Sequence, residues 1–491
     1  MKKTLIAIAS VAALGAAQAD VTLYGVIDAS LATTSAGAGS SDLNNPANMN
    51  VLNSYARAQV GATSQVSGTT ANGRTTSMAN GVLTPSRWGI KGSEDLGSGM
   101  KANFVLESGL NIAGGNNPND HQLLATNASS TGYGDSSLNG QMFDRQASVG
   151  LSGDFGSIDA GFQLNLNGEL NGMNDPLGAG YLSPLGFYGG LTGMGSSYSG
   201  RASNSFKYAY SMGTTTLKAF YAIGGLNGNA GQGSQTGIAA MIKVTPALDV
   251  NIGASRMNDN VAFSTASTSG VATTSATGIA NVGTDATVAA GAIVSGTAPA
   301  LAASYFNSTQ TTLGAVYQAT PTLKLKAGYI SISLSNPSNA AADATITQNI
   351  GVPINPNAIN TQPYATTYGR SIYWVGGTFD LSPQSRVSVG YYSLTLGSYT
   401  SNAYGVNNAS PITQAYSSNT LSTFAGVFDY DLSKKTDVYV AGAYQAWNSN
   451  GAAANSTVTA ASTASNTVAA NQTTSAGTNQ TTFAIGLRVK F

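Results

Sequence analysis

The chain has 491 residues, and Lys+Arg and Asp+Glu both count 21, so only 9% of its residues are charged. A soluble domain usually carries about 25% charged residues. The absence of a basic surplus argues against nucleic-acid binding, and a low net charge is not typical of a disordered chain. The composition is therefore poor in charge without being rich in apolar residues, which make up 42%.

The first nineteen residues have the pattern of a secretory signal peptide. Two lysines stand near the start, Leu5–Ala13 is a short apolar run, and Ala17–Ala19 fits a cleavage site. The apolar run is too short to cross a membrane as a helix. We therefore expect residues 1–19 to be a cleaved signal peptide and residues 20–491 to form one exported domain.

Two features narrow the class of protein further: the scarcity of cysteine and histidine, and the lack of a long apolar run. The chain has no cysteine and one histidine, His121, in a polar segment, so a catalytic base and a transition-metal site are both disfavoured. We expect no enzyme activity, no metal and no cofactor. Beyond residue 19 no run approaches the roughly 18 apolar residues of a transmembrane helix, which leaves a soluble exported protein or a closed β-barrel in an outer membrane.

Most of the remaining chain shows the two-residue period of β-strands. In the last segment Phe483, Ile485, Leu487, Val489 and Phe491 share one face, and small or charged residues share the other. A soluble β-sandwich also alternates in this way. A membrane barrel turns its apolar face to lipid and its polar face to a water-filled lumen.

The lengths of the connections distinguish these two folds. Seven short turns are expected at Ser93–Ser98, Gly153–Ser157, Met212–Thr215, Thr245–Ala247, Thr320–Thr322, Leu381–Ser385 and Asp431–Lys435. Eight long polar segments alternate with them, at about 35–83, 111–142, 166–200, 225–235, 259–308, 334–367, 399–419 and 449–479. This alternation requires sixteen strands and is typical of outer-membrane barrels, which have short periplasmic turns and long outer loops.

We therefore predict an all-β fold, a 16-stranded antiparallel transmembrane β-barrel. The expected strands span about 21–34, 84–93, 99–110, 143–152, 156–165, 201–211, 214–224, 236–245, 247–258, 309–319, 321–333, 368–380, 384–398, 420–431, 435–448 and 480–491.

Six groups of residues along the chain carry a family resemblance. They are Asp20–Ala29, Ser86–Gly97, Arg145–Ala147 with Val149–Gly153, the residues Arg201, Asn204, Ser205, Lys207 and Tyr208, Tyr430–Thr436, and Gly486–Arg488 with Lys490–Phe491. Together they resemble the general porins of Gram-negative, particularly betaproteobacterial, outer membranes. The resemblance implies a trimeric barrel whose third loop folds into the lumen to form a constriction. It also implies that the final Phe491 is the signal read by the barrel-assembly machinery.

The chain departs from the family pattern at three places. Phe162 stands where the family often has Arg; strand parity turns it to the lipid side and leaves Gln163 to line the pore. The third loop, Gly172–Gly200, holds one acid, Asp175, where the family tends to place more. Val489 stands where the family usually has His. We expect a weak field across the pore and modest selectivity.

Strand parity and the family pattern together give the candidate constriction residues. On the wall they are Arg87, Lys91, Lys101, Glu107 and Arg145. The parity of Arg145 conflicts with the rest of its strand, because it would also turn Val149 and Leu151 inward. For each of these charges the alternative is a structural role in a pair with a neighbour.

The long segment at about 166–200, which contains the third loop, supplies the other candidates. Glu169 and Asp175 are the acids expected to face the basic wall, so that a transverse field orients polar solutes. Tyr181, Phe187 and Tyr188 are expected to pack the loop against the inner wall.

These observations predict an outer-membrane channel for passive diffusion of small hydrophilic solutes and ions. Its expected partners are two further copies in a homotrimer, outer-membrane lipid and lipopolysaccharide, and the barrel-assembly machinery, with no nucleic acid. A substrate-selective channel is the first alternative. A surface adhesin or secreted β-rich protein, which the polar loops allow, is the second. The sequence leaves the sign of the ion selectivity open.

Overall fold

The computed structural model describes residues 20–35, 74–110, 112, 142–180, 182–185, 200–224, 231, 233–264, 301–337, 354–360, 362, 364–404, 411–416, 418–447 and 479–491. The expected signal peptide lies outside this part of the chain.

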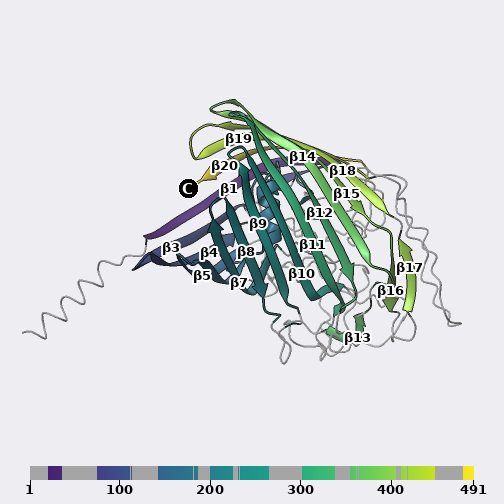
Figure 1. Ribbon diagram of the computed structural model, residues 1–491. Helices are drawn as coiled ribbons and strands as arrows, with labels where there is room; N and C mark the ends of the chain where they lie inside the picture. The colour runs from purple at the N-terminus through teal and green to yellow at the C-terminus, as the bar shows by residue number, and fades with distance from the viewer. Residues whose placement is uncertain are drawn as a thin grey trace, which may run out of the picture.

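Sixteen of the described strands form one closed antiparallel barrel (Figure 1). In chain order they are β1 (Asp20–Ser35), β3 (Arg87–Gly97), β4 (Met100–Gly109), β5 (Gln146–Gly153), β6 (Gly156–Leu164), β7 (Arg201–Met212), β8 (Thr215–Ala222), β9 (Gln235–Thr245), β10 (Leu248–Ser264), β11 (Leu301–Thr320), β12 (Leu323–Ser335), β14 (Tyr368–Ser382), β15 (Ser385–Leu396), β18 (Asn419–Asp431), β19 (Thr436–Trp447) and β20 (Gln480–Lys490).

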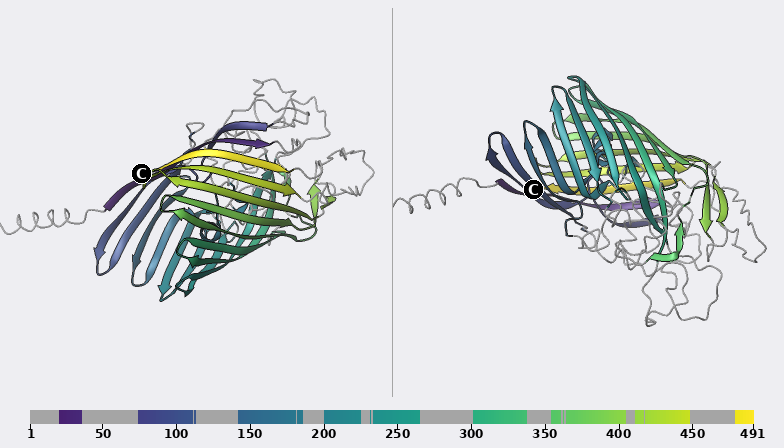
Figure 2. Two further views of the ribbon diagram at one scale, coloured as in Figure 1. Left: turned by 90° about the horizontal axis from the view of Figure 1, so that it is seen from above. Right: turned by 60° about the horizontal axis from the view of Figure 1, so that its bottom comes forward.

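Each of these strands pairs with the next one, and β1 closes the ring by pairing with both β3 and β20. The first strand and the C-terminus therefore lie side by side (Figure 1 and Figure 2). The prediction of a 16-stranded antiparallel barrel is confirmed. In the part of the chain that the structure describes, no helix is long and apolar enough to cross a membrane.

The long connections contain elements that the sequence did not predict. They are β2 (Arg74–Asn80), the helix α4 (Leu166–Asn174), β13 (Ile354–Asn360), β16 (Tyr399–Tyr404) and β17 (Pro411–Tyr416). β2 pairs with the distal half of β1, β13 lies parallel to β11, and β16 and β17 form a separate hairpin. The strands among these segments lack clear alternation. β2 and β13 form because they pair with strands of the barrel, and β16 and β17 pair with each other.

The predicted bounds of three strands, β3, β10 and β11, were wrong. The second strand, expected at 84–93, begins at Arg87 and runs to Gly97, so the first turn is shorter than Ser93–Ser98. Positive φ angles of 82° and 78° at Gly97 and Gly99 make this tight turn possible. β10 and β11 extend well into the expected loop at 259–308, because they continue to pair with each other beyond the alternating residues.

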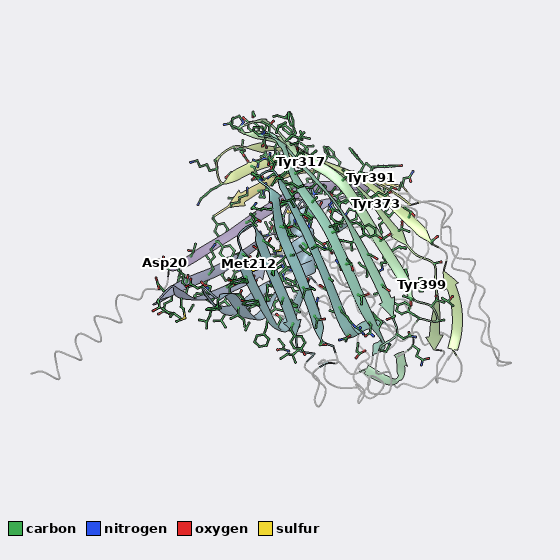
Figure 3. The ribbon with its side chains drawn as sticks, viewed as in Figure 1. Asp20, Met212, Tyr317, Tyr373, Tyr391 and Tyr399 are labelled. Carbon is green, nitrogen blue, oxygen red and sulfur yellow. The ribbon has the colours of Figure 1, made fainter. Side chains whose placement is uncertain are left out.

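The two faces of the barrel differ as the alternation predicts. Large apolar residues such as Val149 and Ile238 point outward and are 61% and 65% exposed. Tyr317, Tyr373 and Tyr391 also lie on this outer face (Figure 3). An outer surface of large exposed apolar side chains is typical of a barrel wall in contact with lipid.

Helix α4 lies inside the barrel against the inner faces of β8 to β12. Its start is capped by Asn165, whose side chain accepts a hydrogen bond from the Gly168 backbone N–H. Leu166 and Leu170, each 1% exposed, pack against Phe220 and its neighbours on the wall. The helix begins directly after β6, so it is the first part of the third loop, and it occupies one side of the lumen.

Candidate functional site

The charged centre of the lumen is built around Glu107 on β4. Its carboxylate lies 2.7 Å from Arg145 Nε and 3.5 Å from Arg87 Nε. The Tyr24 hydroxyl donates to the same carboxylate at 3.0 Å. Arg201, at the start of β7, donates from Nε to the Arg145 carbonyl at 2.6 Å. We call Arg87, Arg145 and Arg201, with Glu107, the arginine cluster.

The arginine cluster contains three of the residues predicted on the wall, and Arg201 in addition. Arg87, Glu107 and Arg145, predicted to line the wall, lie together in ion pairs, which is the alternative role given for them above. Arg145 does not follow the parity of β5, because it precedes the first residue of that strand. In the sequence, only the family resemblance pointed to Arg201. The pairing of β6 with β7 shifts register between Arg201 and Lys207, so strand parity with Lys207 could not have placed Arg201 in the lumen.

The two wall lysines have different positions. Lys91 is exposed on β3, and its Nζ lies 5.3 Å from the centre of the Tyr24 ring, so it adjoins the arginine cluster. Lys101 pairs in register with Asp95 beside the first short turn. Lys101 therefore lies toward the short-turn end of the lumen, away from the cluster.

Glu169 on α4 binds the wall instead of standing free in the lumen. Its carboxylate forms ion pairs with Lys207 on β7 and, at 2.6 Å, with Lys218 on β8. Burial alone raises the pKa of Glu169, but the two lysines outweigh it and hold the pKa below its ordinary value. The first acid of the third loop is thus already neutralised by its own side of the barrel.

Asp175 directly follows α4 and has no exposed surface. Its carboxylate accepts hydrogen bonds from the backbone N–H groups of Leu177 (3.0 Å) and Ala179 (2.6 Å) and from the Tyr392 hydroxyl (2.5 Å). Lys326 donates from Nζ to the Asp175 backbone carbonyl at 2.9 Å. Burial raises the pKa of this carboxyl. Asp175 therefore ties the loop to β12 and β15, and it does not face the arginine cluster.

Uncharged contacts hold the rest of α4. Asn251 donates to the Asn174 side chain at 2.7 Å, and the Trp374 ring N–H donates to the Asn174 carbonyl at 2.9 Å. Ser255 donates to Asn167 at 3.0 Å. Buried polar groups that are paired in this way fix the position of the loop without adding net charge.

The side chain of Gln163, expected to line the pore, is 1% exposed and donates to the Asp159 carbonyl at 3.1 Å. Phe162, expected on the lipid side, is 9% exposed. The pairing of β6 with β7 shifts register between Gly161 and Gln163, where Gly161 has a φ of 135°. Simple parity therefore does not apply at this bulge.

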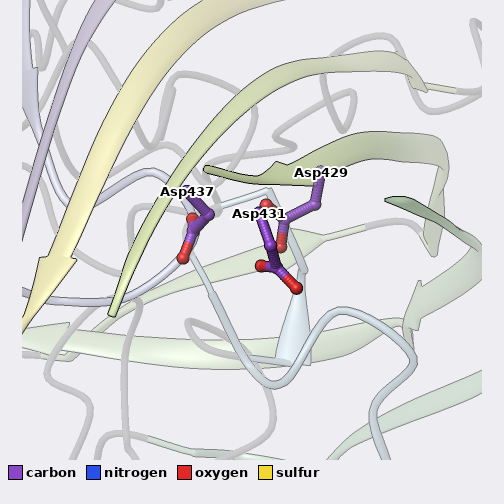
Figure 4. Close-up of side chains that lie close together, drawn as sticks. All are labelled: Asp429, Asp431 and Asp437. Carbon is purple, nitrogen blue, oxygen red and sulfur yellow. The ribbon is translucent and has the colours of Figure 1, made fainter. Parts of the chain in front are cut away.

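Three aspartates gather on the inner face of β18 and β19, as Figure 4 shows for Asp429, Asp431 and Asp437. One carboxylate oxygen from each lies within 4.8 Å of the others. Arg488 donates to Asp437 and Asp429, each at 3.0 Å, and Arg386 pairs with Asp431. The two arginines supply the positive charge that these acids need, so the group is an ion-pair network of the wall.

Several sequence predictions fall elsewhere. Tyr181, Phe187 and Tyr188, expected to pack the third loop, and His121 lie outside the described residues. Phe491 ends the chain on the outer face, 45% exposed. Its backbone N–H and carbonyl each bond to Gly25 at 3.1 Å, which ties the C-terminus to β1.

Comparisons with known proteins agree with this geometry. A family model described as Gram-negative porin matches residues 4–451. An outer membrane porin protein of Bordetella pertussis is 37% identical over 185 residues, which cover 37% of this chain and 38% of that protein. Outer membrane porin protein 32 of Delftia acidovorans is 29% identical over 212 residues, which cover 42% of this chain and 45% of that protein. The chain thus spans less than half the length of these curated relatives.

Solved structures share the fold. The anion-selective porin from Comamonas acidovorans superposes with a TM-score of 0.56 and 17% identity, covering 96% of this chain and 100% of that chain. A loop-deletion mutant of OmpT from Vibrio cholerae gives a TM-score of 0.51 and 12% identity, covering 96% of this chain and 99% of that one.

Proposed function

Because this chain belongs to the Gram-negative porin family, we propose that it forms a water-filled outer-membrane channel for passive diffusion of small hydrophilic solutes and ions. The observation that carries the proposal is the sorting of the barrel wall, with apolar side chains outward and charged side chains inward around a closed ring of sixteen strands. A barrel of this size leaves an aqueous lumen.

The channel favours anions. The arginine cluster brings together three guanidinium groups, which two carboxylates offset in part: that of Glu107 and the buried one of Asp144 near Arg145 and Arg201. Lys91 adds a further positive charge beside the cluster. The two acids of the third loop do not balance this charge, because Glu169 is paired with two lysines and Asp175 is buried. Charges that line a pore set its ion selectivity.

Planar-bilayer recordings in a salt gradient test both statements. Discrete conductance steps with a reversal potential of the anion-selective sign are expected, and Arg87→Glu should move the reversal potential toward cations. Lys243→Glu is the matched control, since it makes the same charge change at an exposed residue, paired with Asp249, on β9.

Two results would count against the proposal. A chain that gives no conductance steps is not a channel. Equal shifts in Arg87→Glu and Lys243→Glu would show that the arginine cluster has no special place on the conduction path.

We also propose that the chain works as a homotrimer in outer-membrane lipid and lipopolysaccharide, and that the barrel-assembly machinery reads Phe491. The exposure of Phe491 on the outer face supports this role. Conductance steps in groups of three are expected. Deletion of Phe491 should lower the amount of barrel in the outer membrane, whereas Phe491→Tyr, which keeps an aromatic terminus, should not. Unchanged levels after the deletion would refute the terminal signal.

A further inference from the structure

The segment of residues 81–86 leaves the barrel wall in the middle of its second strand. β2 pairs with β1 as far as Ala29, opposite Asn80, and β3 resumes the pairing at Val26, opposite Arg87. The six residues 81–86 therefore lie opposite only two residues of β1, Ile27 and Asp28. An insertion of this size cannot lie flat in the sheet, so the segment must fold away from the wall.

The segment folds into the lumen, where Asp28 makes most of its hydrogen bonds and Arg488 donates from Nη1 to the Thr84 hydroxyl at 3.1 Å. The Asp28 carboxylate is fully buried. It accepts hydrogen bonds from the backbone N–H groups of Leu83 at 3.1 Å and Thr84 at 2.9 Å, and from the Tyr439 hydroxyl at 2.5 Å. The Ser86 hydroxyl accepts from the Asp28 N–H at 2.9 Å. Hydrogen bonds to a buried carboxylate are among the stronger ones in proteins.

The far side of the segment contacts the third loop. Val82 is 1% exposed and belongs to the same apolar cluster as Leu182 of the loop, with Leu83 packed against it. A Cβ placed on Gly180 of the loop would lie 2.7 Å from the Leu83 carbonyl oxygen, so the two backbones touch. The same part of the loop, through Leu177, also packs against the apolar cluster of β12, β14 and β15.

We propose that residues 81–86 act as a prop that sets the width of the channel by holding the third loop in place, with Asp28 as its positioning residue. The loop lies in the lumen, anchored on one side by Asp175 and supported on the other by the prop. Loss of the prop frees the loop around Gly180 and Leu182 to move and changes the open cross-section. The inference rests on the channel function proposed above.

Two variants weaken the contact from opposite sides. Asp28→Asn replaces one of the two carboxylate oxygens, which bind the prop N–H groups and the Tyr439 hydroxyl, with an N–H donor. Gly180→Ala forces a methyl group against the Leu83 carbonyl. Each has a matched control: Asp249→Asn removes a carboxylate elsewhere on the wall, paired with Lys243, and Gly172→Ala adds a methyl group where nothing lies within 4 Å.

The readouts are single-channel conductance and the largest neutral sugar that enters proteoliposomes in a swelling assay. Asp28→Asn and Gly180→Ala should both change the conductance and raise the sugar size limit, while both controls keep wild-type values. If Asp28→Asn fails to fold, Gly180→Ala still gives the answer.

A disulfide then separates positioning from a general loss of structure. The natural chain has no cysteine, so V82C with L182C creates a single thiol pair between prop and loop. In the Asp28→Asn background, oxidation should restore the wild-type size limit and reduction should remove it again. A response to the redox state is not expected from a residue that merely stabilises the barrel.

Wild-type conductance and size limit in both Asp28→Asn and Gly180→Ala would overturn the prop, as would equal changes in the variants and their controls. Absence of conductance in the wild-type chain would instead refute the channel itself, so the two failures are distinguishable.

Discussion

The two sides of the lumen use their polar residues differently. On β3 to β7, charged groups meet in the arginine cluster, where Arg145 and Arg87 share Glu107 at 2.7 and 3.5 Å. On β8 to β15, α4 and the residues after it cover the wall, and their contacts are chiefly amides and apolar side chains, such as Asn174 with Asn251. The acid of α4, Glu169, is paired with Lys218 on β8 and with Lys207 on the adjoining strand β7.

This difference assigns a separate role to each side of the lumen. The covered side holds the third loop in place, and the open side selects the solute. Uncharged buried contacts can anchor the third loop without creating a field of their own. The charges of the open wall then act on passing ions without competition from the loop. If this division is right, changes on the covered side alter the position of the loop, and changes on the open side alter selectivity.

The largest expected effect is on the covered side. Leu170→Ala should leave a cavity between α4 and the wall and weaken the docking of the loop by about 2–5 kcal/mol. Faster proteolysis of the third loop in detergent, with the barrel intact, is the expected result. Met173→Ala, on the same helix but 43% exposed, is the control. Equal cleavage rates in the two variants would contradict the packing role of α4.

On the open side, Glu107→Gln removes a carboxylate that offsets the three arginines of the arginine cluster. A neighbouring unit charge changes the energy of a passing monovalent ion by about 1 kcal/mol in water at 4 Å. The reversal potential should therefore shift to a value that indicates stronger anion selectivity. Asp175→Asn changes charge by the same amount inside the covered loop and should move it less. A larger shift from Asp175→Asn would reverse the comparison of the two sides.

The pH dependence of loop docking should follow Asp175. Burial raises its pKa above the ordinary 3.8, so the docked loop binds the proton more tightly than the undocked loop. Docking is therefore strongest below about pH 3.8 and weakens as the pH rises through the raised pKa. The groups that face it are the Tyr392 and Ser183 hydroxyls, and Lys326, which donates to its backbone carbonyl.

Proteolysis of the third loop measures this dependence. The rate relative to that of a pH-matched standard substrate should fall as the pH is lowered from neutral toward 4. Asp175→Asn should abolish the trend, and Asp249→Asn should retain it. A trend that survives in Asp175→Asn would assign the titration to another group.

The smallest expected effect comes from Tyr24→Phe. The change removes the hydroxyl that donates to Glu107 but keeps the ring beneath Lys91. The loss of one hydrogen bond is worth about 0.5–1.5 kcal/mol, and the charges of the arginine cluster are untouched. A small loss of thermal stability with an unchanged reversal potential is expected. A reversal potential that moves as far as in Glu107→Gln would show that Tyr24 itself governs selectivity.

The wall of the barrel could be predicted because its pattern is local. Alternation and the order of short and long connections indicated sixteen strands, and strand parity turned Arg87, Lys91 and Glu107 inward. Prediction failed where the period breaks. Arg145 precedes its strand, Gln163 follows a bulge, and residues 81–86 leave the sheet altogether.

By itself the sequence determined the membrane wall. In lipid each backbone group must be paired and each outward side chain must be apolar. The alternation within each strand therefore shows which of its faces contacts lipid and which contacts water. Only the tertiary structure decided what the third loop does with its acids. Asp175 meets Tyr392, 217 residues away, and no local period relates such residues. Whether an acid faces the pore or anchors a loop depends on which distant groups surround it, and burial among donors chose the anchor.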